Sequence, residues 1–286
     1  MLHLANEALA VALLDPANPA EQRHLGTRFC WGGYIWQVRD AQGGDLFTGP
    51  EWPNPDPRPF NGQGAPESFR HAAWPTQLPL TLVGGRGLVL GVGEVTPGAD
   101  GSPVVDRPCG WEISGDDRTL EFHTRQSALG WECRLARRVT LAGRTLISTS
   151  RLDNHGGRAL PLHWFAHPFF ALADGVLTCD LPPGYGCDEN PGFALDPRGR
   201  LTFKRRFTGL NDGHFQLLQV PPRVPLQVTL SHPRLAYVRF ATDFVPDLCP
   251  VWGNGNTWSI EPYLITELAP GESREWTLQY EFGPIR

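Results

Sequence analysis

The chain of 286 residues contains no apolar run of about 18 residues, which is the length that a membrane span requires. Its basic residues are scattered, and a formal net charge of −5 provides no positive field for nucleic acid. Residues 2–14 are apolar but lack a basic lead and a small-residue cleavage site, so we expect a strand there rather than a signal peptide. These absences predict a cytoplasmic protein that binds neither nucleic acid nor membranes.

Motifs for metals, nucleotides and covalent chemistry are also missing. The six cysteines form no C-x-x-C pair, so we expect reduced, mostly buried thiols instead of a zinc ribbon or a disulfide framework. The glycine-rich segment 84–87 lacks the Gly-Lys-Ser/Thr ending of a phosphate loop, and no G-x-S-x-G motif occurs. We therefore expect no bound metal or cofactor and no covalent catalysis.

Alternation of apolar and polar residues is abundant, whereas convincing helical periodicity is absent. Residues 130–153 contain two alternating runs around Ala142 and Gly143, which is a hairpin pattern, and residues 276–282 contain another run. Similar runs occupy 78–83, 88–95, 226–230 and 235–240. Gly and Pro punctuate these runs without forming low-complexity tracts or an obvious linker. The sequence therefore predicts an all-β fold in a single domain, residues 1–286.

Two segments combine polar residues and prolines in a distinctive order. Residues 154–170 read NHGGRALPLHWFAHPFF and place His167 before Pro168. Residues 258–263 read WSIEPY and place Glu261 before a proline as well. Because the residue before a proline is restricted to extended backbone, we expect both side chains to have fixed directions.

These segments resemble the galactose mutarotase (aldose 1-epimerase) family. Its pattern is Asn-x-Gly, a Pro, then His-Pro/Ser-Tyr/Phe-Phe, followed near the C-terminus by Glu before a small residue or Pro. The similarity is nearly continuous from Trp131 onward and looser before it. The resemblance implies a large antiparallel β-sandwich, or supersandwich, whose concave sheet carries a sugar site. It also implies a cofactor-independent enzyme that interconverts the α and β anomers of a hexose.

The resemblance implies catalytic roles for Glu261 and His167. Anomer interconversion requires a base that takes the C1 hydroxyl proton and an acid that protonates the ring oxygen. Unperturbed pKa values near 4.3 for Glu and 6.5 for His suit these two roles at neutral pH. The local sequence alone also allows a core histidine and an exposed strand carboxylate. We expect the two side chains to face each other across a sugar-sized gap on one concave sheet.

Two polar contacts to the sugar are implied in the same way. Asp212 resembles the family's hydroxyl-binding Asp, although residues 211–213 are equally an ordinary Asn-Asp-Gly turn. Arg58 could stand for the family's substrate arginine. The family's His-Gly position reads Gln63-Gly64 here, so Gln63 would replace the histidine.

Further candidates lie close to the two motifs. His163 precedes His167 by four residues, a spacing of roughly 13 Å on a strand, which excludes a shared metal ion. His163 either shares the face of His167 or packs in the core. Trp164 and Trp258 are candidate platforms for the C–H faces of a sugar.

The missing histidine leaves two alternatives open. A hexose-phosphate 1-epimerase would need several cations converging on one phosphate, for which Arg28, Arg58, Arg70 and Arg86 are available. A non-catalytic carbohydrate-binding protein is the other alternative. We expect a neutral monosaccharide or related carbohydrate, because residues 204–206 are the only basic cluster in the better-matched half and strand neighbours point to opposite faces.

Overall fold

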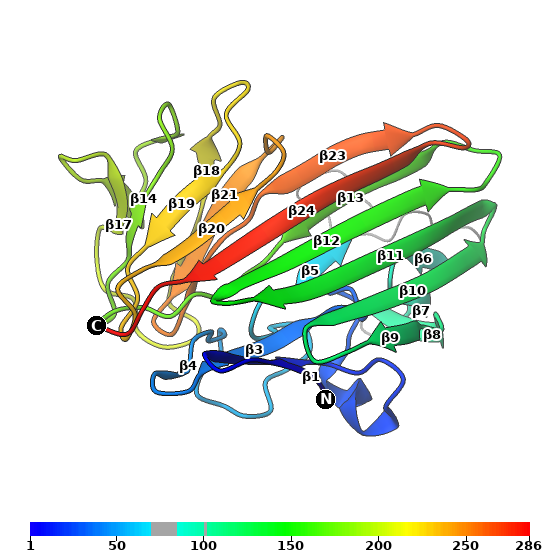
Figure 1. Ribbon diagram of the computed structural model, residues 1–286. Helices are drawn as coiled ribbons and strands as arrows, with labels where there is room; N and C mark the ends of the chain where they lie inside the picture. Colours follow the sequence, from blue (N-terminus) through cyan, green and yellow to red (C-terminus); the bar gives the residue numbers. More distant parts are fainter. Residues whose placement is uncertain (70–84, 100–101) are drawn as a thin grey trace.

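Antiparallel strands make up most of the molecule. The computed structural model describes residues 1–69, 85–99 and 102–286 (Figure 1). The largest sheet has ten strands, in the order β16 (Phe193–Leu195), β17 (Arg200–Phe203), β14 (Thr178–Asp180), β19 (Gln227–Leu230), β20 (Val238–Thr242), β24 (Ser273–Phe282), β12 (Thr145–Asn154), β11 (Trp131–Ala142), β10 (Thr119–Ala128) and β9 (Glu112–Gly115).

Smaller antiparallel sheets pack against this large sheet. They are β23 (Tyr263–Leu268), β13 (Leu160–Ala166) and β5 (Glu67–Phe69); β15 (Gly186–Cys187), β18 (Gly213–Gln219), β21 (Cys249–Asn254) and β22 (Trp258–Ile260); β1 (Leu2–Ala5), β2 (Leu9–Leu13), β3 (Ile35–Asp40) and β4 (Gly44–Asp45); and β6 (Gly87–Val89), β7 (Gly93–Pro97) and β8 (Pro103–Pro108). A 3-10 helix, Pro19–His24, is the only helix among the described residues. One buried apolar cluster extends from Leu4 to Phe282 and joins the layers. The fold is an all-β antiparallel sandwich, as the sequence predicts.

The alternating runs form strands with one buried face. Residues 131–154 form the β11–β12 hairpin, in which Trp131, Cys133 and Leu135 are buried and Glu132 is exposed. In β24 the apolar residues of the run 276–282 are at most 1% exposed. This inward set faces the second layer, because alternate strand residues point to opposite faces.

Some boundaries differ from expectation. Residues 2–14 form the hairpin β1–β2 instead of one strand, because the Asn6 side chain accepts hydrogen bonds from the backbone N–H groups of Ala8 and Leu9 and closes a turn. The run 88–95 is likewise divided between β6 and β7. The run 78–83 lies outside the described residues.

The layers are connected by a buried ion pair. Arg137 of β11 contacts Glu67 of β5, and both residues are 1% exposed. Glu67 also accepts hydrogen bonds from Ser148 of β12 at 2.8 Å and from the indole of Trp164 in β13 at 3.0 Å. Because buried charges require compensation, these contacts fix β5 and β13 against the large sheet.

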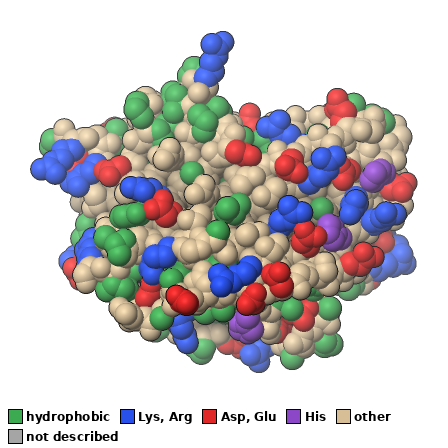
Figure 2. All heavy atoms as spheres, viewed as in Figure 1, with side chains coloured by type: hydrophobic (Ala, Val, Ile, Leu, Met, Phe, Trp, Pro, Cys, Tyr) green, Lys and Arg blue, Asp and Glu red, His purple; other side chains and the backbone are tan. Residues whose placement is uncertain are grey.

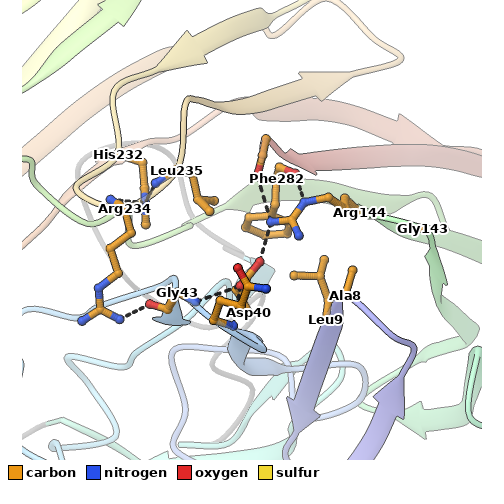
Figure 3. A network of polar contacts seen from close by, with 12 residues as sticks. Ala8, Leu9, Asp40, Gly43, Gly143, Arg144, His232, Arg234, Leu235 and Phe282 are labelled. Carbon is orange, nitrogen blue, oxygen red and sulfur yellow. Dashed lines mark hydrogen bonds and ion pairs between the residues drawn. The ribbon is translucent and has the colours of Figure 1, made fainter. Parts of the chain in front are cut away.

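The β1–β4 sheet is joined to the C-terminal strands by a second set of polar contacts (Figure 3). Arg144, in the β11–β12 turn, donates to Asp40 Oδ2 at 2.6 Å and to the carbonyls of Phe282 and Gly283. Asp40 also accepts the backbone N–H groups of Gln42 and Gly43, both at 2.8 Å.

The surface and the thiols agree with the composition. Acidic and basic side chains are interspersed on the face shown in Figure 2. All six cysteines are free thiols, four of them buried. No helix of the described chain has the length and apolarity of a membrane span.

Candidate active site

A cavity of about 400 Å³ brings His167 and Glu261 together with residues from distant parts of the chain. β18, β21 and the start of β23 contribute Phe215, Trp252 and Tyr263. The other lining residues include Arg28, Pro50, Arg58, Phe60, Asn61 and Phe169. The cavity therefore lies on the smaller sheets and their loops, not on the ten-stranded sheet.

His167 and Glu261 are in direct contact. His167 Nε2 lies 3.2 Å from Glu261 Oε1, and the two residues are 3% and 5% exposed. Backbone hydrogen bonds hold both positions, from His167 N to Pro66 O and from Glu261 N to Pro250 O, each 2.9 Å long. A buried imidazole–carboxylate pair, with both backbones held by hydrogen bonds, thus borders a cavity large enough for a small molecule.

Strand register explains this contact. His167 follows β13, Glu261 precedes β23, and these antiparallel strands pair with Phe165 opposite Tyr263. When the same register is continued by two residues, His167 falls opposite Glu261. Directly opposed residues have Cβ atoms about 4.5–5.5 Å apart, so the side chains touch. The expectation of a sugar-sized gap between them is therefore wrong.

An aromatic shell fixes the imidazole ring. The ring of His167 lies 4.4 Å from that of Phe169, 5.9 Å from those of Phe29 and Phe165, and 6.5 Å from that of Trp252. His167 consequently carries packing as well as its polar contact, so removal of the ring would disturb the packing around Phe169.

The tryptophan platform at the cavity is not the one that the sequence suggested. Trp252 and Phe215 are register partners on β21 and β18, and both line the cavity. Trp164 is fully buried, where it packs against Trp276 at 5.3 Å, and Trp258 is 1% exposed against Phe170.

The reason is strand parity. Trp164 precedes His167 by three residues, and Trp258 precedes Glu261 by three. Residues three apart on an extended strand point to opposite faces, so both indoles enter the core while His167 and Glu261 border the cavity. Neither tryptophan lines the cavity.

Asp212 and His163 also lie away from the cavity lining. Asp212 accepts two hydrogen bonds from Arg205, at 2.6 and 2.8 Å, and one from the backbone N–H of Thr208. The hydrogen bonds from Arg205 lower the pKa of Asp212 well below its ordinary value. The carboxylate therefore stabilises its own turn, as the alternative interpretation held. His163 is half-buried on β13, on the same side as Phe165.

Two of the four candidate arginines line the cavity. Arg58 Nε donates to Glu51 Oε1 at 3.0 Å. Burial alone would raise the pKa of Glu51, but hydrogen bonds from Arg58, Asn61 and Asn54 lower it below its ordinary value. Arg28 stacks 4.8 Å from the centre of the Phe60 ring and donates to the Phe60 carbonyl at 2.8 Å.

The remaining candidates lie elsewhere. Arg86 pairs with Glu94 and Asp106, and Arg70 lies outside the described residues. Gln63 is 5% exposed and borders a different cavity. Sequence reasoning missed Phe60, Phe169 and Phe215. Finding them would have required the cross-strand register and the placement of the loops.

The chain is similar to known proteins in its fold and not in its sequence. No protein-family model matches the chain, and no curated protein matches its sequence. Among solved structures, a galactose mutarotase-related enzyme from Lactobacillus acidophilus superposes with a TM-score of 0.63 at 13% identity, covering 98% of this chain and 96% of that one. A galactose mutarotase-like protein from Lactobacillus casei gives 0.59 at 15% identity, covering 99% of both chains.

A third structure agrees with these two. A galactose mutarotase-like protein from Clostridium acetobutylicum gives a TM-score of 0.58 at 13% identity, covering 99% of this chain and 94% of that one. Superposition over nearly the whole length of the chains, at only 13–15% sequence identity, reflects a shared architecture. The chain therefore has the galactose mutarotase-like fold, a large antiparallel β-sandwich.

Proposed function

We propose that this protein is a cofactor-independent aldose 1-epimerase that interconverts the α and β anomers of a hexose. The observation that carries the proposal is the buried contact of 3.2 Å between His167 and Glu261 at the edge of a cavity of about 400 Å³. The similarity in fold to galactose mutarotase-related structures supports the same reaction class.

Direct contact between acid and base suits this reaction. The hydroxyl oxygen and the ring oxygen of a hexose are both bonded to C1, so the groups that exchange protons with them must be neighbours. Glu261 takes the C1 hydroxyl proton while His167 Nε2–H protonates the ring oxygen. The bond from C1 to the ring oxygen breaks, the C1 carbonyl forms, and rotation about C1–C2 presents its other face. Reversal of both proton transfers closes the ring.

The rest of the cavity supplies surfaces for a sugar. Trp252 and Phe215 offer apolar faces to the sugar C–H groups. Asn61 and Arg58 supply amide and guanidinium donors for its hydroxyl groups.

The test is polarimetry on two conservative variants. Glu261→Gln and His167→Asn should each slow the equilibration of α-glucose or α-galactose by roughly 10²–10⁴-fold, the usual contribution of one general acid or base. Asparagine is chosen because alanine at position 167 would also leave a packing defect beside Phe169.

Matched controls are available on the same strands. His163→Asn on β13 and Glu267→Gln on β23 lie outside the cavity lining and should keep the parent rate. If Glu261→Gln and His167→Asn also kept it, the proposed mechanism would be rejected. Saturable sugar binding by a parent protein that shows no turnover would identify a carbohydrate-binding protein instead.

A phosphorylated hexose is the second candidate substrate, because Arg28 and Arg58 both border the cavity. We still expect neutral sugars to be preferred. Glu51 compensates the positive charge of Arg58, and the carboxylate of Glu261, paired with His167, adds negative charge to the cavity. The measurement compares kcat/KM for glucose and glucose 6-phosphate at one ionic strength. A preference of about a hundredfold for the phosphate, lost in Arg28→Gln, would support the phosphate epimerase, because charge-assisted contacts are the strong ones.

A further inference from the structure

A second cavity, of about 460 Å³, lies on the outer face of the β1–β4 sheet. Two cross-strand rows line it, His3–Ala12–Gln37 and Ala10–Arg39–Asp45. The members of each row are register partners on adjacent strands, so they share one face of the sheet. The intervening row, Leu4, Val11 and Val38, has fully buried side chains that face the core. The cavity is therefore built on the opposite side of this sheet from the core.

Small residues and aromatic walls create the hollow. Ala10 and Ala12 occupy the middle strand of the cavity floor and fill little space. The larger apolar residues of its lining are Trp36, Trp52, Pro53 and Pro55, beside Met1 and Val11. Flat indole faces beside polar side chains are a suitable surface for the C–H face of a pyranose ring.

The polar lining is held in place by hydrogen bonds. The Gln37 side chain accepts from the backbone N–H of Phe47 at 2.9 Å and donates to the Phe47 carbonyl at 3.1 Å. Arg39 Nε donates to Asp45 Oδ1 at 2.8 Å. Side chains fixed before binding lose little conformational entropy when a ligand arrives.

Charge and hydrogen-bond capacity indicate a neutral, hydroxyl-rich ligand. Arg39 and Asp45 carry compensating charges, and the amino group of Met1, which also borders the cavity, contacts Glu21. The bond between Arg39 and Asp45 uses one of five guanidinium donors and one of about four carboxylate acceptor positions. The remaining positions suit hydroxyl groups, which both donate and accept.

The two cavities are separated by the loop of residues 50–63. Pro50, Arg58 and Asn61 of this loop line the candidate active site, whereas Trp52 and Gln63 line the second cavity. The second cavity is thus a separate place on the molecule. Gln63, which the sequence suggested as a substrate contact, belongs to it.

We propose that the second cavity is a binding site for a neutral saccharide, separate from the candidate active site. Its pyranose ring lies over Ala10 and Ala12 against the indole of Trp52, with hydroxyl groups on Arg39 and Asp45. Catalysis takes no part in this binding, so the site exists whether or not the protein is an epimerase.

The test is titration calorimetry with glucose, galactose, maltose, lactose and cellobiose as probes. Ala10→Phe fills the floor at an exposed strand position that tolerates aromatic residues, and Trp52→Ala removes the platform. Each variant should weaken binding of at least one probe by roughly tenfold or more. Both should keep the polarimetric rate of the parent protein.

Two controls separate this site from the first. Ala41→Phe, in the β3–β4 turn outside the cavity lining, should bind as the parent does. Glu261→Gln should retain, within about twofold, the component of binding that Ala10→Phe and Trp52→Ala weaken. The proposal is overturned if no probe binds saturably, if Ala10→Phe and Trp52→Ala leave every affinity unchanged, or if Glu261→Gln abolishes the component of binding that these two variants weaken. Displacement of the sugar by a proline-rich peptide but by no second saccharide would also overturn it.

Discussion

At the scale of single residues, the placement of the tryptophans separates binding from stability. Trp252→Ala should raise KM for the sugar by about tenfold with little change in the melting temperature, because this half-buried indole borders the cavity. Initial-rate polarimetry over a range of sugar concentrations measures KM.

Trp258→Leu is the contrasting variant. It should lower the free energy of unfolding by roughly 3 kcal/mol and leave KM unchanged, because Trp258 is 1% exposed within the core. The reverse outcome, with KM rising in Trp258→Leu and not in Trp252→Ala, would show that the wrong indole has been assigned to the sugar.

At the scale of elements, the neutral imidazole ring of His232 connects two sheets by hydrogen bonds. It follows β19, is 2% exposed, and its Nδ1 accepts the backbone N–H groups of Arg234 and Leu235 (Figure 3). Its Nε2 lies 3.2 Å from the carbonyl of Leu46, next to β4, and donates to it. Protonation of Nδ1 would replace an acceptor with a donor that faces two other donors.

The acid stability of the protein should reflect this arrangement. Burial, the largest cause, lowers the pKa of His232 from 6.5 to about 4. Between these values the unfolded chain binds a proton that the folded chain does not, so the free energy of unfolding falls as the pH falls. The loss from this residue reaches about 3 kcal/mol near pH 4.

Urea unfolding at a series of pH values measures that slope. His232→Gln should be less stable at pH 7 but should lose less stability on acidification than the parent, whereas His155→Gln, at an exposed position, should keep the parent slope. Equal slopes for all three proteins would contradict a neutral, buried His232.

The sequence predicts the positions of strands better than it predicts which strands and loops lie next to one another. Alternation identifies β11, β12 and β24 and their buried faces, because the side-chain period of a strand is local information. The same parity would have excluded Trp164 and Trp258 from the cavity. Phe60 and Asn61 could not be found in this way, since they reach the cavity on a loop whose course depends on packing between sheets.

At the scale of the whole molecule, the candidate site depends on register between sequence-distant strands. His167 meets Glu261 because β13 pairs with β23. The two residues could be named in advance because residues 154–170 and 258–263 resemble motifs of the galactose mutarotase family. The distance between them could not be predicted, because β13 and β23 are separated in sequence by strands of two other sheets.

The position of β24 has a consequence for how the molecule is made. This last strand lies between β20 and β12 in the middle of the ten-stranded sheet. During synthesis, the ribosome therefore releases both halves of that sheet before the strand that joins them. Until Phe282 emerges, the exposed edges of β12 and β20 are open to pairing with other nascent chains, a hazard that chaperones in the cell exist to limit.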